Sequence, residues 1–423
     1  MAQRCRSKKS VLAGRRLYNR RMSTNAAHLA PMTPVALYLA VVQCFFALGW
    51  TVYVLFLPEL LARAGVDKSW TPWVLALDQA VFAVADLAMG LAVDRARAGL
   101  RRIGPLLLGL VAVSTLAMLV MPHAAGVGST LFLGLTLLWV ASSAALRAPP
   151  FALLGRYAAK SAVPRLVALQ LFGLAFASAL APYLGLALKG IDPAWPFTLA
   201  SLSILASSGG LVWAEQRLAH TASTTGSTAA STEAEQPLAF PSPLALLMMA
   251  GLLAAALGFQ FHVALNAASQ VKRVADASWL PLILPVFWGG LAFGLLFAGK
   301  MGERLGNARA AGLGCVFGAL ALAGGAEASS VGTVAVAHGF AGAAWALTLA
   351  CGIGLATTSG RSGAEGRYSG LFFSLLALGT LARIGLSLAG TPQAWQAGTD
   401  WWPVVAWAAA AFFLLQLTPR RSP

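Results

Sequence analysis

Four charged side chains lie inside long apolar stretches of the sequence. Asp78 and Asp86 share one stretch, Arg147 closes another, and Arg383 lies well inside a third. If these stretches cross a bilayer, each charge needs a compensating interaction, because a charge at the bilayer centre costs about 2.5 to 3.5 kcal/mol on insertion scales. A buried carboxylate can take up and release a proton, and a guanidinium can pair with it or hold an anionic or polyhydroxyl solute.

The two carboxylates have different expected depths. They are eight residues apart, so they lie about 80° apart on the same broad side of a helix. Asp86 falls near mid-depth, where it either loads and unloads a proton or is permanently paired or solvated. Asp78 falls nearer the outer end of its stretch, where it either belongs to a proton site or gate or simply reaches water.

Arg147 and His262 each have two interpretations. Arg147 precedes two prolines, which bend or end helices, and its guanidinium either contacts a solute or gate or extends to the inner surface. His262, Asn266 and Gln270 recur every four residues and form one polar stripe on a helix. His262 either carries a proton or is a satisfied packing residue.

Composition places the chain in a membrane. Hydrophobic residues make up 58%, charged residues only 10%, and the mean hydropathy is +0.73. No water-soluble domain of this length has such a composition. The formal charge of +16 belongs to membrane topology, so we expect no nucleic-acid partner. The sequence has no cluster of a nucleophile with a base, no phosphate loop ending in Lys-Ser or Lys-Thr and no metal-ligand spacing, so we expect no enzyme, cofactor or metal.

Twelve apolar runs of about 18 to 25 residues are each long enough to cross the hydrocarbon core as a helix. The sequence therefore predicts an all-α polytopic membrane protein with 12 transmembrane helices. The predicted spans are 34–57, 73–93, 103–121, 130–148, 164–188, 195–213, 244–266, 279–298, 308–325, 331–355, 368–389 and 402–417.

The loops predict the orientation. Most basic loop residues fall on the side of the termini, whereas the opposite loops hold only Arg63, Lys68, Lys189, Lys272 and Arg273. By the positive-inside rule both termini are cytoplasmic, as in a bacterial inner (plasma) membrane. We expect a basic N-terminal tail (1–33), a six-helix half (34–213), a cytoplasmic linker (214–242), a second six-helix half (243–417) and a C-terminal tail (418–423).

Two tight loops share one pattern: a glycine, three residues, an acid and an arginine. The first copy is Gly90, Asp94 and Arg95, and the second is Gly299, Glu303 and Arg304, followed by Gly306. The pattern resembles the signature loop of the major facilitator superfamily (MFS), which lies between spans two and three and recurs between spans eight and nine. The first copy has Arg97 where the family's next glycine is usual. The resemblance covers about residues 34–417 and implies two pseudo-symmetric six-helix halves.

The resemblance also implies contacts between the halves. Asp94 would face the start of span eleven near Tyr368 and Ser369, and Glu303 the start of span five near Pro164. Each carboxylate could meet the positive end of a helix dipole there. Spans two and eleven face each other in the family, which leads to the hypothesis that Asp78 and Arg383 form an outer gate that pairs when the protein faces inward. Alternatively, Arg383 pairs within its own half or binds substrate.

Spans one, four, seven and ten line the central cavity in this family. The residues that would line it here, unless they serve only as helix packing, are Gln43, Trp50, Trp139, Ser143, Arg147, Asn266, His338 and Trp345. Such a lining suits a sugar or aromatic solute.

The resemblance therefore implies a secondary carrier of a small organic solute, working by alternating access and driven by protons, in a monomer within the lipid bilayer. An efflux antiporter for drugs or metabolites on the same fold is one alternative. A sensor or lipid-handling protein that transports nothing is another.

Overall fold

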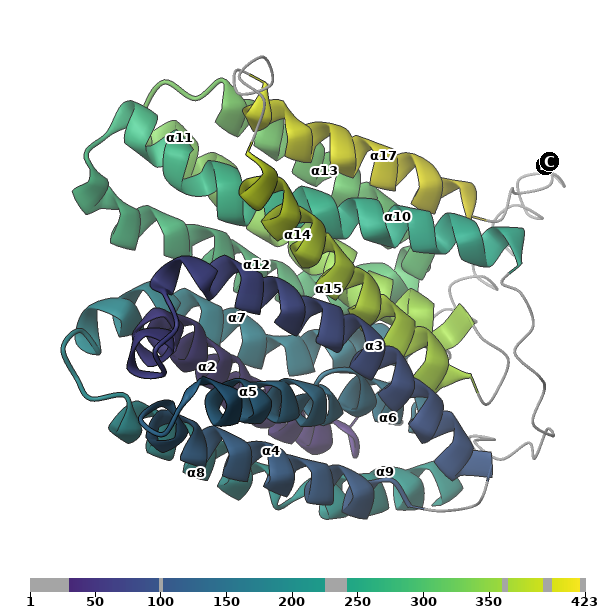
Figure 1. Cartoon of the computed structure of the whole chain (residues 1–423). Helices are drawn as coiled ribbons and strands as arrows, with labels where there is room; N and C mark the ends of the chain where they lie inside the picture. The colour runs from purple at the N-terminus through teal and green to yellow at the C-terminus, as the bar shows by residue number, and fades with distance from the viewer. Residues whose placement is uncertain (1–29, 99–101, 225–241, 360–363, 391–397, 419–423) are drawn as a thin grey trace, which may run out of the picture.

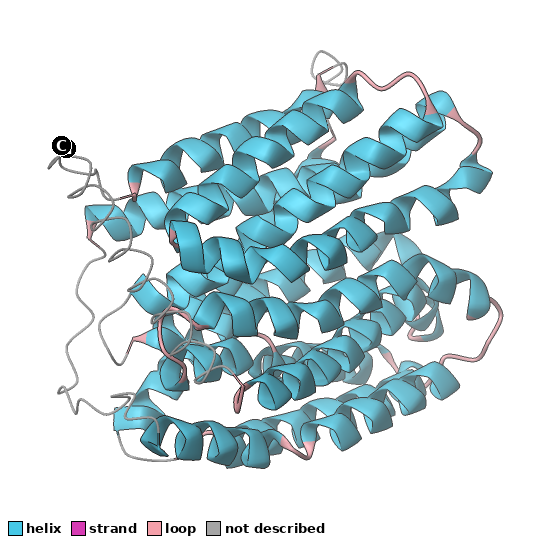
Figure 2. Ribbon diagram, turned by 180° about the vertical axis from the view of Figure 1, so that it is seen from behind, coloured by secondary structure: helices cyan, strands magenta, loops and turns pink. Residues whose placement is uncertain are grey.

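The computed structural model describes residues 30–98, 102–224, 242–359, 364–390 and 398–418. These residues form helices joined by short loops, and no strand occurs among them (Figure 2). The prediction of an all-α protein is confirmed.

The helices form two bundles, with the purple and blue helices in one and the green and yellow helices in the other (Figure 1). The first bundle holds α2 (Thr33–Arg63), η1 (Lys68–Trp70), α3 (Thr71–Ala98), α4 (Gly104–Ala125), α5 (Ser129–Ser143), η2 (Ala144–Leu146), α6 (Ala148–Tyr157), α7 (Val163–Ala187), α8 (Ala194–Ser208) and α9 (Leu211–Thr224). The second holds α10 (Pro243–Gln260), η3 (Phe261–Asn266), α11 (Ala267–Val274), η4 (Ala277–Trp279), α12 (Leu280–Leu305), α13 (Asn307–Ala326), α14 (Val331–Ser359), α15 (Glu365–Ala389), η5 (Thr399–Trp401) and α17 (Trp402–Gln416).

Within the described residues, 11 helical segments are long and apolar enough to cross a membrane. The remaining predicted span corresponds to α17, which has 15 residues and packs against α10 and α13 in the second bundle. We call the side at which α2 begins and α17 ends the terminal face, and the other side the opposite face.

The fourth span differs from its prediction. It was expected to end at residue 148, but it continues through η2 and α6 to Tyr157. Pro149 and Pro150 lie in the first turn of α6, where a missing backbone N–H leaves no hydrogen bond unmade. Arg147, at the break, has φ −91° and ψ −81° and belongs to neither helix. The prolines therefore start a second helix inside the membrane, and Arg147 lies within the span.

The sixth span also extends beyond its prediction, because α9 carries it to Thr224. The buried side chains of α9, which include Leu211 and Leu218, lie on one face of the helix, and this burial keeps the start of the predicted linker helical. Buried Glu215 accepts hydrogen bonds from the N–H groups of Ile103 (3.0 Å) and Gly104 (2.7 Å) and so caps α4. Residues 225–241 of the predicted linker and residues 1–29 of the N-terminal tail lie outside the described residues.

The two bundles meet where α3 packs against α15 and α7 against α12. Glycines allow the close approach at the first contact, since a Cβ added to Gly90 would lie 2.2 Å from the carbonyl oxygen of Gly366. Nearer mid-depth, the Ser374 hydroxyl donates to the carbonyl of Ala83 (2.6 Å). This contact depends on bare backbone, as close helix packing in membranes commonly does.

We expect Gly90→Val to destabilise the joined halves, because its side chain would clash with the α15 backbone. Overpacking of this kind costs about 1 to 3 kcal/mol. The midpoint of thermal unfolding in detergent should fall for this variant. Gly109→Val is the matched control, because nothing lies within 4 Å of a Cβ at Gly109. Equal midpoints for the two variants would contradict the role of Gly90.

Candidate functional site

An ion pair lies at the break in the fourth span. Arg147 Nε is 3.0 Å from Asp86 Oδ2, and the Arg147 side chain is 16% exposed while Asp86 is fully buried. The guanidinium also lies over the ring of Phe82, 4.1 Å from its centroid, and 6.0 Å from the centroid of Phe373 in the other half. Arg147 therefore does not extend to the inner surface, and Asp86 is paired rather than isolated in this conformation.

Asp78 lies eight residues before Asp86 on α3. Its side chain is fully buried, so it does not reach water. Its Oδ2 accepts a hydrogen bond of 2.7 Å from the hydroxyl of Tyr53, and within the described chain its Oδ1 has no partner. Sequence analysis missed Tyr53. The available signal was its position three residues after Trp50, which puts both aromatic rings on neighbouring faces of one span.

Arg383 is half-buried on α15, and its Nε has no hydrogen-bond partner among the described residues. No ion pair with Asp78 occurs in the part of the chain that the structure describes. The expected outer gate is thus not formed in this conformation. The hypothesis assigned that pair to an inward-facing state, so it stays a prediction.

The aromatic residues predicted for the cavity of the first half pack on one another. The rings of Trp50 and Trp139 stack with centroids 5.7 Å apart, and Tyr53 lies 4.6 Å from Trp139. Trp139 is buried, and the Ser143 hydroxyl donates to the carbonyl of Val140 in its own helix (3.0 Å). Gln43 is also buried. Trp139 and Ser143 thus pack within the first bundle in this conformation, and their place in the cavity lining stays a prediction.

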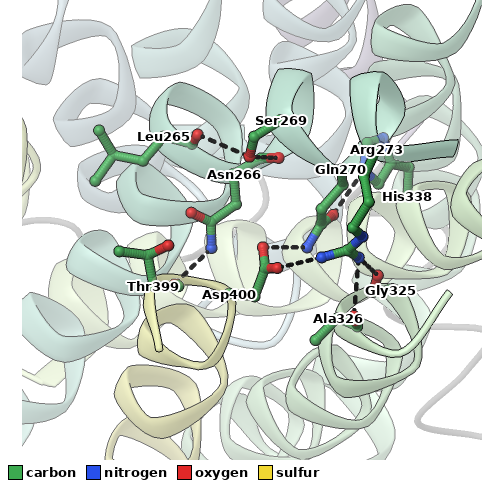
Figure 3. Close-up of polar contacts among 10 residues, drawn as sticks. All are labelled: Leu265, Asn266, Ser269, Gln270, Arg273, Gly325, Ala326, His338, Thr399 and Asp400. Atoms are coloured by element: carbon green, nitrogen blue, oxygen red, sulfur yellow. Dashed lines mark hydrogen bonds and ion pairs between the residues drawn. The ribbon is translucent and has the colours of Figure 1, made fainter. Parts of the chain in front are cut away.

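In the second half, the predicted polar stripe of span seven is buried. His262 and Asn266 lie in the π-helix η3, between α10 and α11, and Gln270 lies in α11. Figure 3 shows how two of its side chains, Asn266 and Gln270, are held. The Asn266 amide donates to the carbonyl of Thr399 (2.8 Å), and the Gln270 amide donates to Asp400 Oδ1 (3.2 Å). Gln270 Oε1 lies 3.3 Å from His338 Nε2, so Gln270 links an acid at the opposite face to a buried histidine.

Arg273 completes this network. Its Nη1 lies 2.5 Å from Asp400 Oδ2, and its Nη2 donates to the carbonyls of Gly325 (3.3 Å) and Ala326 (2.8 Å) at the end of α13. A guanidinium at a helix C-terminus satisfies carbonyls that have no partner within the helix. The arginine thereby fastens α11, α13 and the start of η5 together.

Two imidazole rings pack against each other next to the network of Gln270, Arg273 and Asp400. The rings of His262 and His338 are 4.8 Å apart in an edge-to-face arrangement, and Phe287 lies 5.4 Å from His262. Both nitrogens of His262 and Nδ1 of His338 are buried without hydrogen-bond partners in the described chain. Trp345 stacks between Phe259 (4.6 Å) and Trp407 (5.8 Å) and so packs within the bundle.

The first copy of the loop pattern makes the contact expected between the halves. The two oxygens of Asp94 accept hydrogen bonds of 2.8 Å from the backbone N–H groups of Gly366 and Arg367, in the first turn of α15. The contact lies one or two residues before the predicted positions. A carboxylate is stabilised there by unsatisfied N–H groups and by the helix dipole. Arg95 is exposed.

The second copy makes its contact through glycine rather than acid. A Cβ on Gly299 would lie 2.6 Å from the Cα of Arg165, and one on Gly302 would lie 2.9 Å from the Cβ of Pro164. Glu303 Oε1 is buried without a hydrogen-bond partner in the described residues, and Arg304 is exposed. Gly306, with φ +81°, forms the turn into α13.

Solved structures share this fold. The human organic anion transporter MFSD10 aligns with a TM-score of 0.69 at 15% identity, over 92% of this chain and 100% of its own. The proton:xylose symporter XylE aligns with a TM-score of 0.67 at 12% identity, over 93% and 97%. FucP in an outward conformation aligns with a TM-score of 0.63 at 13% identity, over 92% and 99%. No curated protein matches the chain in sequence.

The two bundles and their membrane-length helices define a polytopic membrane fold. The family model of the Major Facilitator Superfamily matches residues 39–382. The chain therefore belongs to this superfamily, whose members are transporters and not enzymes. The predicted family and fold class are confirmed.

We expect Asp94→Asn to weaken the contact with α15, because an amide has one acceptor oxygen where the carboxylate has two. Losing a charged hydrogen bond costs about 1.5 to 3 kcal/mol. Transport should be lost while insertion is intact, and spin-label distances across α3 and α15 should lengthen at the terminal face. Asp192→Asn, on an exposed loop, is the control. Unchanged distances and normal transport in Asp94→Asn would contradict the assignment.

Proposed function

We propose that the protein is a proton-coupled secondary carrier of a small organic solute that works by alternating access. The observation that carries the proposal is the Asp86–Arg147 ion pair, buried at a helix break beside the interface of the two halves. Structural pairs of this kind are costly to bury and are weak evidence for stability, which favours a functional reason for it.

The chemistry of coupling follows from the pair. When the Asp86 carboxylate takes a proton it becomes neutral, and the Arg147 guanidinium loses its counter-ion. The free guanidinium then favours an anionic or polyhydroxyl group of the solute, which it can hold through several N–H donors. When the proton leaves, Asp86 competes for Arg147 and the solute is released. Proton and solute binding thereby become linked at one residue pair.

The contacts between the halves support the proposal that this conformation is closed toward the cytoplasm and open to the other side. Asp94 with α15, Gly299 with Arg165, and Ser374 with Ala83 lie between the terminal face and mid-depth. A carrier closed toward the cytoplasm and open to the other side would have its contacts there, if the terminal face is cytoplasmic as the basic loops predict. Rocking of the halves would break these contacts and open the other pose.

Two further groups belong to this proposal. Asp78, held by Tyr53, is a second carboxylate on α3. His262 is a second candidate proton carrier in the other half, supported by its ring nitrogens, which have no hydrogen-bond partner among the described residues, and by the Gln270 link from His338 to Asp400. We propose a monomer in a bacterial inner (plasma) membrane with both termini in the cytoplasm, and with the solute, protons and bilayer lipid as its partners.

Proteoliposomes test the coupling. The purified chain, loaded in turn with monosaccharides and small organic anions, should accumulate one class under an imposed pH gradient. Asp86→Asn should then abolish accumulation, at least about tenfold, because the pair no longer responds to protons. Solute exchange without a gradient should persist. Glu59→Gln, an exposed carboxylate, is the control. Gradient-driven accumulation by Asp86→Asn would overturn the role of Asp86.

Charge reversal tests the outer gate. Asp78→Arg and Arg383→Asp should each abolish transport, and the double reversal should restore part of it if the two side chains pair during the cycle. Tyr53→Phe separates the gate from the local hydrogen bond, because it leaves both charges in place. Additive losses in the double variant would rule out the pair.

A further inference from the structure

A series of hydrogen bonds runs from the opposite face of the second bundle to a buried histidine (Figure 3). It begins at Asp400, whose carboxylate is ion-paired with Arg273. It continues through the side-chain amide of Gln270 and ends at Nε2 of His338, and both of these side chains are buried. An ion pair at the opposite face is thereby connected to a ring inside the bundle.

The acid at one end sets the direction of every hydrogen bond in the series. Arg273 keeps Asp400 ionised and in place. An ionised carboxylate only accepts, so Asp400 Oδ1 takes its hydrogen from the amide nitrogen of Gln270 (3.2 Å). The amide oxygen of Gln270 then faces His338. Because this oxygen also only accepts, Nε2 of His338 must carry a hydrogen (3.3 Å).

His338 is therefore held in one tautomer. No ion pair involving its ring occurs among the described residues, and a buried imidazole without a counter-ion is neutral. A neutral imidazole carries a single hydrogen, which here is on Nε2, so Nδ1 keeps a bare lone pair. That nitrogen is buried and has no hydrogen-bond partner in the described part of the chain.

His262 packs against the same ring. The two ring centroids are 4.8 Å apart, and both nitrogens of His262 are also buried without a hydrogen-bond partner among the described residues. Buried polar atoms left unpaired cost free energy, and each one in a folded protein calls for an explanation. His262 lies in the π-helix η3, and π-helical turns frequently occur at functional sites. The pair of rings is thus a candidate for binding a ligand that supplies the missing partners.

The types of nitrogen decide which ligand fits. Nδ1 of His338 only accepts, so it binds an N–H or O–H group and repels a carboxylate or carbonyl oxygen. A neutral His262 offers one donor and one acceptor, which a hydroxyl group can meet with its own acceptor and donor. A charged ammonium is a poor match, because neither ring supplies an anion to pair with it at this depth. An uncharged hydroxylated compound fits the pair best.

We infer that Asp400 and Gln270 are positioning residues that keep Nδ1 of His338 bare, and that this nitrogen accepts a hydrogen bond from a hydroxyl group of the transported solute. The inference rests on the proposed function and narrows it. Of the anionic and polyhydroxyl groups that Arg147 can hold, it selects the uncharged polyhydroxyl class. Both rings are buried in this conformation, so the solute reaches them only when the helices around η3 shift.

Nitrogen NMR tests the tautomer without any solute. The full-length protein is isotope-labelled in the rings of its five histidines, and the His338 signals are assigned by their loss in His338→Phe. The wild type should show a hydrogen on Nε2 and a bare Nδ1. Gln270→Met keeps the length of the side chain but removes the amide, so it should give a mixture of both tautomers. Gln260→Met removes another amide of the same span and is the control.

Matched solutes test the contact with the hydroxyl group. Proteoliposomes under a pH gradient are supplied with aldohexoses and with the uronic acids that carry a carboxylate in place of the terminal hydroxymethyl group. The wild type should accumulate at least one hexose about tenfold better than its uronic acid, the ratio that corresponds to one hydrogen bond. His338→Phe keeps a planar ring without a lone pair and should lose this preference. His338→Asn carries a side-chain oxygen at about the place of Nδ1 and should keep part of it.

The two experiments fail separately. A hydrogen on Nδ1 in the wild type, or an unchanged tautomer in Gln270→Met, would overturn the positioning role. A preference for the uronic acids, or the same preference in the wild type and His338→Phe, would overturn the contact with the solute. Uptake of neither class would overturn the proposed function and this contact with it, whereas the NMR spectra would still decide the tautomer.

Discussion

The absence of water from the hydrocarbon core is the constraint on which this structure depends. Every polar group placed there must find its partner within the protein. Asp86 meets this condition through Arg147, and Asp78 through Tyr53. The break between α5 and α6 is what allows the first pair to form, since it places an arginine inside a span rather than at its end. A local irregularity of the backbone thus makes a buried charge tolerable.

The two halves satisfy the same constraint differently. In the first, charge lies between α3 and α6, and a carboxylate fastens the terminal face to α15. In the second, the Arg273–Asp400 ion pair and the amide of Gln270 form a network near the opposite face, and the corresponding loop contact is made by glycine packing. The two related loop patterns therefore make different contacts: Asp94 accepts hydrogen bonds from backbone N–H groups, whereas Glu303 Oε1 has no hydrogen-bond partner in the described residues and Glu303 interacts with Arg165 only through its charge.

Sequence patterns predicted the class of fold, because the length of each apolar run and the repeated loop pattern can be recognised in the sequence without knowing which helices pack together. They also placed Asp94 within two residues of its contact. They did not predict the Asp86–Arg147 pair, because the fourth span was expected to end at residue 148, which left Arg147 at its end either to contact a solute or gate or to extend to the inner surface. Tyr53 and Asp400 were missed for another reason. Each acquires its role from a partner on a different helix, which spacing within one helix cannot reveal.

The π-helix in span seven has a consequence for the length of that segment. A π-turn holds one residue more than an α-turn and takes up that residue within the turn, so α11 continues nearly in phase with α10. A regular α-helix cannot do this, and removing one residue between Asn266 and Gln270 would turn Gln270 and Arg273 by about 100° about the helix axis. Both would then point away from Asp400 and the end of α13. The chain can vary the chemistry of these positions far more easily than it can vary their number.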